Sequence, residues 1–326
     1  MEKGEIPARC LCETYARVTE NAALVAARWL GSGDETAAEQ DASKAMREAL
    51  DEMPIRARIV IGVNESEWLP VGEEVGAGGG QFDLAVHPLE GRGVVARGGS
   101  GAMSMLAVGD PDSLTTLPQM YMRRMAVGPV ARDRIDLLRP VGENIHAIAE
   151  AFGRNVNDIT TIVLDRPRHH DLIEEIRAAG ARIKLIQDGD VTASISAAIR
   201  GTNDHLAIGI GGTRQAILSA AALRCLGGGI QAQLWPTTRS EIEYVRAHGI
   251  EDVNRIFTID DLAPGEVIVV LTGVSTGDLL RGVQFHADSG RTRTLVMCTR
   301  CNWVRFVDGI HFFRRERREE VRLPGV

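Results

Sequence analysis

The chain of 326 residues has no long hydrophobic run. Its longest apolar stretches, such as residues 206–211 and 267–271, run to about six residues, whereas a membrane-spanning helix needs roughly 20. The first residues, with Glu2 and Glu5 ahead of Pro7, lack the basic and then apolar order of a secretory signal. These absences predict a cytoplasmic protein with no membrane partner.

An excess of positive charge is also missing, since the net charge is -7 at pH 7. Binding to nucleic acid without sequence preference depends on clustered Lys and Arg that neutralise phosphates. A basic run at residues 314–318 is interrupted by Glu316 and followed by two further glutamates, which is typical of a solvated segment. We therefore expect no nucleic-acid partner.

Cysteine is scarce, with five residues in the whole chain. This odd number does not indicate a disulfide framework. Cys10 and Cys12, together with Cys298 and Cys301, could in principle offer four thiolates to zinc. However, one residue separates the first pair, where structural zinc sites usually have about two to four, and nothing in the sequence brings the pairs together. The sequence therefore favours ordinary buried or unpaired thiols.

What remains is an ordinary globular composition, 44% apolar and 25% charged, in a chain long enough for two packed domains. In the first part, apolar residues at helical spacing predict helices at 14–30 and 36–53. Short apolar runs predict strands at 58–62 and 82–86. Both strands lead into polar loops, which is where sheet proteins place their chemistry.

From about residue 157, short apolar runs alternate with helical segments. We expect strands at 161–164, 183–186, 205–210 and 267–271, and helices at 170–179, 191–200 and 213–225. This alternation predicts an α/β fold with a mostly parallel sheet covered on both faces. We accordingly divide the chain into an N-terminal α+β domain, residues 1–155, and a C-terminal α/β domain, residues 156–326.

Several acidic residues lie in or beside the loops of the N-terminal part: Asp34, Glu65, Glu67, Asp83 and Glu90. Carboxylate oxygens are the ligands that hard divalent cations prefer. Acidic surface loops without a metal are common, so this pattern alone leaves both interpretations open.

Three loops of the C-terminal part have the chemistry of a phosphosugar site. Residues 209–213, Gly-Ile-Gly-Gly-Thr, follow a strand and open a helix, where backbone N–H groups can hold a phosphate. Residues 166–168, Arg-Pro-Arg, and 188–190, Asp-Gly-Asp, follow neighbouring strands. The carboxyl ends of parallel strands line one crevice, so guanidinium and carboxylate groups would face each other there. The alternative is that the arginines pair with surface carboxylates and that Asp190 only caps a helix.

Motifs along the chain support the phosphosugar interpretation. In order, they are residues 17–24, 29–34, 59–62, 88–91, 120–122, 127–129, 166–169, 188–191, 209–212 and 272–280. Between about residues 12 and 310 the chain resembles the class II fructose-1,6-bisphosphatases. The resemblance implies the layered αβαβα sugar-phosphatase fold, a sugar-phosphate ligand and a homodimer or homotetramer. It implies substrate contacts at Gly91, Tyr121, Arg166, Pro167, Arg168, Asp188, Gly189, Asp190 and Gly212, with Arg166 in place of the family's Lys.

The family's metal positions differ more. Asp34 and Glu90 match its metal-binding acids, but three other acidic positions hold Val63, His87 and Gln215. Arg92 replaces a threonine that helps to orient the attacking water. Together these changes alter the local charge by about four units, each worth on the order of 4 kcal/mol at ~4 Å and an effective dielectric constant near 20. We therefore expect the site to reject a second Mg²⁺ or Mn²⁺.

We consequently predict a diverged phosphosugar-binding protein that hydrolyses fructose 1,6-bisphosphate inefficiently or performs other sugar-phosphate chemistry. Its candidate catalytic residues are Glu90, His87 and Arg92. Either one Mg²⁺ or Mn²⁺ binds at Asp34 and Glu90, with Glu65 or Glu67, or no metal binds and His87 and Arg92 hold the phosphate directly. The alternatives are a metal-dependent sugar-phosphate phosphatase with an altered site and a non-catalytic regulatory partner.

Overall fold

The computed structural model describes residues 12–63 and 66–313. Cys10, Glu65 and the basic run at residues 314–318 therefore lie outside the described residues. Within them, no helix is both long and apolar enough to cross a membrane.

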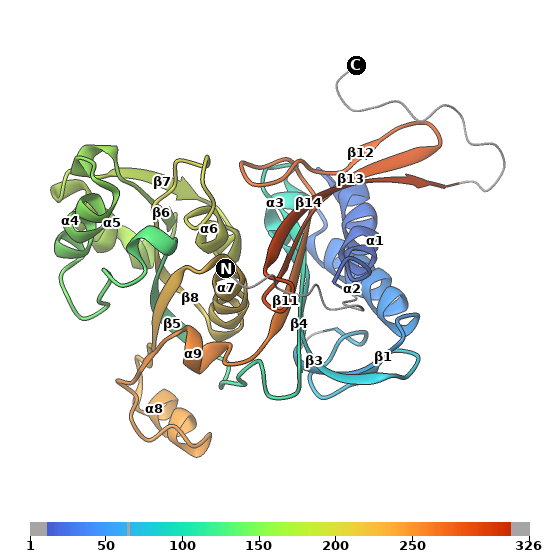
Figure 1. Cartoon of the computed structure of the whole chain (residues 1–326), viewed down its shortest axis with the longest axis horizontal. Helices are drawn as coiled ribbons and strands as arrows, with labels where there is room; N and C mark the ends of the chain where they lie inside the picture. Colours follow the sequence, from blue (N-terminus) through green and yellow to red (C-terminus); the bar gives the residue numbers. More distant parts are fainter. Residues whose placement is uncertain (1–11, 64–65, 314–326) are drawn as a thin grey trace, which may run out of the picture.

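Two β-sheets and three groups of helices form alternating layers (Figure 1). α1 and α2 cover the outer face of the first sheet, α6 and α7 lie between the sheets, and α4 and α5 cover the outer face of the second. The helices are α1 (Ala16–Ala26), α2 (Glu35–Asp51), α3 (Arg92–Ala96), α4 (Val141–Phe152), α5 (His170–Ala178), α6 (Asp190–Ser196), α7 (Thr213–Leu226), α8 (Arg239–Ala247) and α9 (Ile259–Leu262). This arrangement confirms the predicted layered α/β fold.

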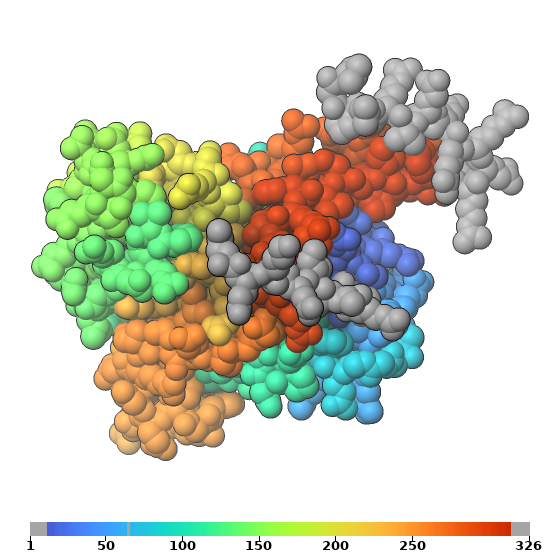
Figure 2. Space-filling view, in the orientation of Figure 1, coloured from blue at the N-terminus to red at the C-terminus, as the bar shows by residue number. Residues whose placement is uncertain are grey.

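The first sheet has the order β12-β13-β11-β4-β3-β1-β2, with β14 paired to β13. Its strands are β1 (Ile55–Ile61), β2 (Glu74–Val75), β3 (Gly80–Glu90), β4 (Met103–Gly109), β11 (Val267–Gly273), β12 (Gln284–Phe285), β13 (Ser289–Cys298) and β14 (Trp303–Phe312). The predicted strand at 267–271 therefore belongs to this sheet, where β11 runs antiparallel between β4 and β13. In Figure 2 the red β13–β14 segment lies across the middle of the visible face.

The second sheet has the order β10-β9-β5-β8-β6-β7. Its strands are β5 (Tyr121–Val127), β6 (Thr160–Leu164), β7 (Arg182–Ile186), β8 (Leu206–Gly212), β9 (Gly229–Leu234) and β10 (Ile256–Phe257). β6 is parallel to β7 and β8, but β5 is antiparallel to β8 and β9. The prediction of a mostly parallel sheet was therefore wrong, because the antiparallel β5 was not recognised as a strand.

The hydrophobic core follows the layers because successive strand residues point to opposite faces of a sheet. In β5, Met122 and Ala126 pack toward α7, whereas Met125 and Val127 pack toward α4 and α5. A third cluster joins α1 and α2 to the first sheet. After β4 the chain leaves the first sheet and builds the second, and at β11 it returns to the first. The predicted division into residues 1–155 and 156–326 has a single boundary, and it stays a prediction.

Candidate phosphosugar site

Hydrogen bonds fasten the loop after β6 to the neighbouring strand β8. The buried His169 ring bridges them: Nδ1 donates to the Leu164 carbonyl at 2.8 Å, and Nε2 accepts from the Ile210 amide at 2.8 Å. The guanidinium of Arg168 donates to the Ile210 carbonyl at 2.9 and 3.2 Å. These bonds hold Arg168 at the mouth of the predicted crevice.

Tyr121 extends the same surface. It lies opposite Gly212 in the β5–β8 ladder, and the Arg168 guanidinium lies 4.9 Å from the centre of its ring. The ring is about half exposed, with a relative accessibility of 51%. Arg166, on the same loop as Arg168, instead donates to the Gln187 carbonyl on the loop after β7, at 2.5 Å. The Tyr121 ring and the Arg168 guanidinium therefore form one solvent-facing platform.

The Asp-Gly-Asp segment gives its two carboxylates different surroundings. Gly189 has φ +92°, a left-handed conformation that favours glycine, and it begins α6. This turn sends Asp190 into an ion pair with the buried guanidinium of Arg124. Asp188 instead keeps its side chain in contact with solvent and lines a cavity.

Glu90 lies beneath this turn and is 2% exposed. Its carboxylate accepts from the Val191 amide at 3.0 Å and from the Thr192 hydroxyl at 2.6 Å. Burial, together with the negative charges of Asp190 and Asp188, raises the pKa of Glu90 to about 8. The carboxyl group is therefore mainly protonated at neutral pH.

The cavity next to Asp188 has a volume of about 370 Å³. It is lined by Glu39, Val63, His87, Leu89, Gly91, Arg92, Gln119, Asp188, Arg214 and Gln215. Val63, His87, Arg92 and Gln215, which lie far apart in the sequence, thus meet at one place. Gly212 adjoins this wall, because a β-carbon there would collide with Gln215 Oε1.

Two arginines, Arg92 and Arg214, line this cavity together with the carboxylates of Glu39 and Asp188. Arg92 follows Gly91, whose φ of +87° turns the chain into α3, and its guanidinium pairs with Glu39 at 2.7 Å and with Glu35 at 3.7 Å. Arg214 donates to the carbonyl of Gly62. Both arginines therefore have defined positions.

His87 lies between these positive groups. Desolvation of the ring, followed by the charges of Arg214 and Arg92, lowers the pKa of His87 to about 4. The imidazole is therefore neutral at pH 7 and adds no net charge to the cavity.

Comparison with known proteins assigns a family to this arrangement. A sequence model described as bacterial fructose-1,6-bisphosphatase, glpX-encoded, matches residues 9–311. The chain belongs to the class II fructose-1,6-bisphosphatase family. Three relatives carry the name D-fructose 1,6-bisphosphatase class 2/sedoheptulose 1,7-bisphosphatase. The relative from Synechococcus sp. (strain JA-3-3Ab) is 42% identical over 90% of this chain and 93% of its own length. Those from Crocosphaera subtropica and Microcystis aeruginosa are 38% and 36% identical, over 90% and 94% of this chain and 94% and 97% of their own lengths.

Class II fructose-1,6-bisphosphatases are metal-dependent phosphatases, and a hard divalent cation prefers carboxylate ligands. Asp34 is exposed at the start of α2, where its side chain accepts from the Ala37 amide at 2.9 Å, and it does not line the cavity. Glu67 is exposed as well, and Glu65 lies outside the described residues.

The metal-ligating side chains that lie close together can be named for the described residues only, which leave out Glu65. Within residues 12–63 and 66–313, a single group of three His, Cys, Asp or Glu side chains brings its ligand atoms within 4.8 Å of one another, and it consists of cysteines far along the chain from the cavity residues. Among the described residues, the two carboxylates that line this cavity, those of Glu39 and Asp188, do not belong to such a group.

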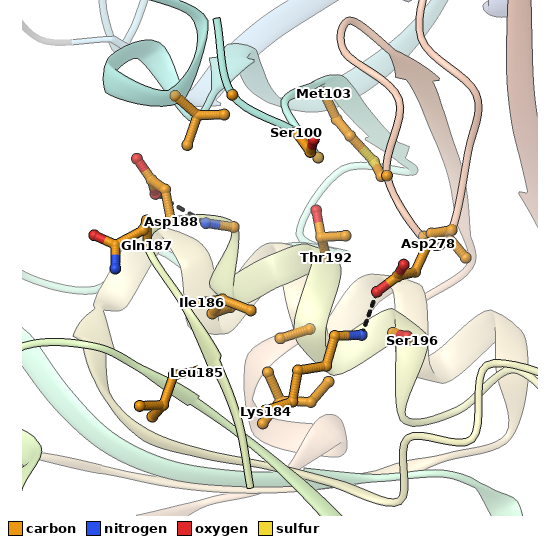
Figure 3. Close-up of a pocket in the computed structure, with 18 of the residues that line it drawn as sticks. Ser100, Met103, Lys184, Leu185, Ile186, Gln187, Asp188, Thr192, Ser196 and Asp278 are labelled. Atoms are coloured by element: carbon orange, nitrogen blue, oxygen red, sulfur yellow. Dashed lines mark hydrogen bonds and ion pairs between the residues drawn. The ribbon is translucent and has the colours of Figure 1, made fainter. Parts of the chain in front are cut away.

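Asp188 and Gly189 also line a second cavity, of about 330 Å³. Figure 3 shows Asp188 at one end of this cavity and Lys184 with Asp278 at the other. The Lys184 ammonium lies 2.5 Å from Asp278 and 2.9 Å from the buried carboxylate of Asp204. The pair with Asp278 joins β7 of the second sheet to the loop after β11 of the first, whereas the pair with Asp204 joins β7 to the segment before β8.

Several residues of the site were not predicted. Arg214 follows the predicted Gly-Gly-Thr turn directly, and its place beside Gln215 was a usable signal. Glu39 and Arg124 gave no signal, because a carboxylate on a helix and an arginine in a strand usually face solvent. Their roles arise from tertiary contacts alone.

Proposed function

We propose that this class II fructose-1,6-bisphosphatase homologue binds a sugar phosphate in the cavity beside Asp188 and hydrolyses it inefficiently. The proposal rests on one observation: Arg92 and Arg214 both line a single cavity of about 370 Å³. Guanidinium groups bind phosphate oxygens with charge-assisted hydrogen bonds in fixed geometry. The neutral His87 is able to accept or donate a further bond.

The sugar would lie across the platform next to this cavity. Asp188 offers carboxylate oxygens to hydroxyl groups, while Tyr121 and Arg168 offer an apolar face and positive charge. The relatives are named for fructose 1,6-bisphosphate and sedoheptulose 1,7-bisphosphate, so ketose phosphates are the ligand class to test.

Inefficient hydrolysis is proposed because metal-dependent phosphoryl transfer uses cations to generate hydroxide and to neutralise developing charge. Val63 and Gln215 face the cavity where the family resemblance places two carboxylates. Arg92 supplies positive charge at the cavity without lowering the pKa of a bound water in the way a cation does. Binding without rapid phosphate release is the expected outcome.

The test measures phosphate release from a panel of sugar mono- and bisphosphates, with and without Mn²⁺, beside thermal-shift binding of the same compounds. We expect stabilisation by at least one ketose phosphate, with little release. Arg168→Ala and Tyr121→Ala should lose the shift, whereas Arg177→Ala, an exposed arginine on α5, serves as the matched control.

Two outcomes would contradict the proposal. The first is rapid Mn²⁺-dependent release that disappears in Glu90→Gln and Asp34→Asn variants, which would establish a phosphatase with an altered metal site. The second is the absence of binding by every compound, with Tyr121 and Arg168 variants indistinguishable from the native chain.

A further inference from the structure

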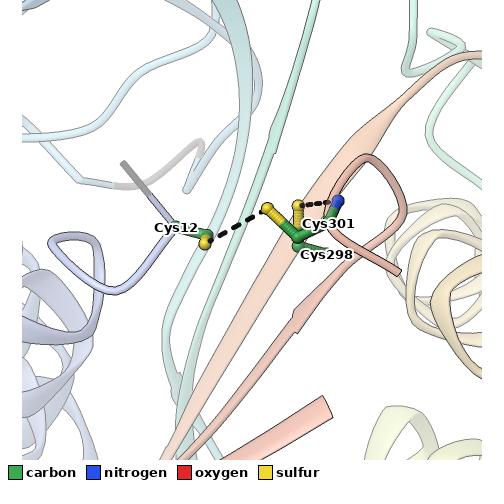
Figure 4. Close-up of side chains that lie close together, drawn as sticks. All are labelled: Cys12, Cys298 and Cys301. Atoms are coloured by element: carbon green, nitrogen blue, oxygen red, sulfur yellow. Dashed lines mark hydrogen bonds between the residues drawn. The ribbon is translucent and has the colours of Figure 1, made fainter. Parts of the chain in front are cut away.

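Three cysteines from the two ends of the described chain meet at one point of the first sheet (Figure 4). Cys12 precedes α1, while Cys298 ends β13 and Cys301 lies in the turn before β14. Their sulfur atoms all lie within 4.8 Å of one another. Cys12 and Cys298 are each 1% exposed, and Cys301 is partly buried. The fold thus brings Cys12, from the first cysteine pair in the sequence, next to both cysteines of the second pair.

The spacing of the sulfurs matches a tetrahedral thiolate site. Zinc binds thiolates at ~2.3 Å, so two sulfurs of a tetrahedron lie about 3.8 Å apart. Cys12 Sγ and Cys301 Sγ are 3.9 Å apart. A disulfide instead needs ~2.0 Å between two sulfurs, and it would use two of the three groups.

The Cys-x-x-Cys turn has a geometry that suits metal binding. It lies between two strands paired along their whole length, and the backbone N–H of Cys301 points at Cys298 Sγ at 3.3 Å. Asn302 completes the turn with φ +50°, a left-handed conformation that asparagine tolerates. An N–H aimed at a sulfur stabilises the thiolate form that a metal requires.

A fourth, partly buried sulfur provides a contrast. Cys225 on α7 lies close enough to Cys298 for that group to help burial raise the pKa of the Cys225 thiol, but it does not belong to the three-sulfur group. Its Sγ points at the Val267 carbonyl at 3.8 Å. Cys225 therefore lies near Cys298, but its sulfur is not one of the three that meet at the proposed metal position.

We propose that Cys12, Cys298 and Cys301 bind one Zn²⁺ that serves a structural role. The ion would join residues separated by 289 positions in the sequence, fastening the segment before α1 to the β13–β14 hairpin. Soft thiolate ligands select zinc over Mg²⁺ or Mn²⁺, so this site is chemically separate from the phosphosugar cavity. The described residues supply three thiolates, and a water molecule would complete the four-coordination of the ion.

The first measurement is the metal content of the purified native chain by elemental mass spectrometry. The bound metal is then exchanged for Co²⁺. We expect about one zinc per chain and, after exchange, the intense visible bands of tetrahedral cobalt with a thiolate-to-metal charge-transfer band. This readout needs no variant and does not depend on folding of a substituted chain.

Variants then assign the ligands. Cys298→Ser combined with Cys301→Ser should lower zinc affinity by more than about tenfold, while Cys225→Ser, at the neighbouring partly buried thiol, should keep full zinc content. The proposal is overturned if the native chain takes up neither zinc nor cobalt, if mass spectrometry finds a disulfide between Cys12 and Cys301 in the purified protein, or if the double variant retains zinc.

Discussion

Replacing the buried Glu90 by glutamine should stabilise the protein at neutral pH. The carboxyl has an ordinary pKa of 4.5 and a folded-state pKa of about 8, because burial and the nearby Asp190 disfavour its charged form. At a pH between these two pKa values, the carboxyl has lost its proton in the unfolded chain and keeps it in the folded protein. The free energy of unfolding therefore falls as pH rises from 4.5, and the fall is complete near pH 8.

The size of the effect follows from the two pKa values. Each pH unit in this window costs about 1.4 kcal/mol, so the full loss is about 5 kcal/mol, of which about 3 kcal/mol has accrued at pH 7. Glutamine is uncharged, like the protonated carboxyl. Its oxygen still accepts from the Val191 amide, and the Thr192 hydroxyl, which donates to Glu90 in the native chain, turns to accept from the amide nitrogen.

Urea denaturation of the native chain and of Glu90→Gln at pH 6, 7, 8 and 9 checks this reasoning. The advantage of the variant should grow by about 1.4 kcal/mol per pH unit up to pH 8 and then level off. Glu48→Gln, at an exposed position on α2, should give no such slope. A difference between native chain and Glu90→Gln that is the same at every pH would refute the protonated state of Glu90.

Three further predictions concern the scaffold of the site. His87, with its folded-state pKa lowered to about 4, costs the native chain about 3 kcal/mol of stability as pH falls from 6.5 to 4, and denaturation of His87→Gln over this range should lack that loss. Breaking the buried Arg124–Asp190 pair by Asp190→Asn should lower the free energy of unfolding by about 3 to 5 kcal/mol, measured in urea, whereas a loss below 1 kcal/mol would show that solvent compensates Arg124. His169→Ala leaves two buried backbone groups unpaired and should cost at least about 2 kcal/mol, visible as a lower Tm, while an unchanged Tm would mean that water replaces the ring.

The sequence predicted the local parts of this molecule better than the long-range ones. The loops at Arg168 and Asp188 were predicted because a strand followed by a glycine-containing or proline-containing turn and a helix has a local signature. The gathering of His87 and Arg92 followed from the family resemblance. The partner of Arg92, Glu39, was not predictable, because a glutamate on an amphipathic helix has the same local pattern whether it faces solvent or a cavity.

Long-range pairing explains the remaining errors. Cys12 and Cys301 are 289 positions apart, and no periodicity relates them. Likewise, β11 has the apolar composition of a buried strand, which fits either sheet equally well. Only the register with β4 and β13 decides its place.

The position of β11 also has a consequence for the order of synthesis. β4 ends at Gly109, and its neighbour β11 begins at Val267, so a growing chain completes every strand of the second sheet before the centre of the first can close. Until then β4 presents an unpaired hydrophobic edge of the kind that associates with other chains. Closing so large a loop slows folding more than it lowers final stability. A chain that stops before Val267 should therefore collect as aggregate rather than as a smaller folded domain.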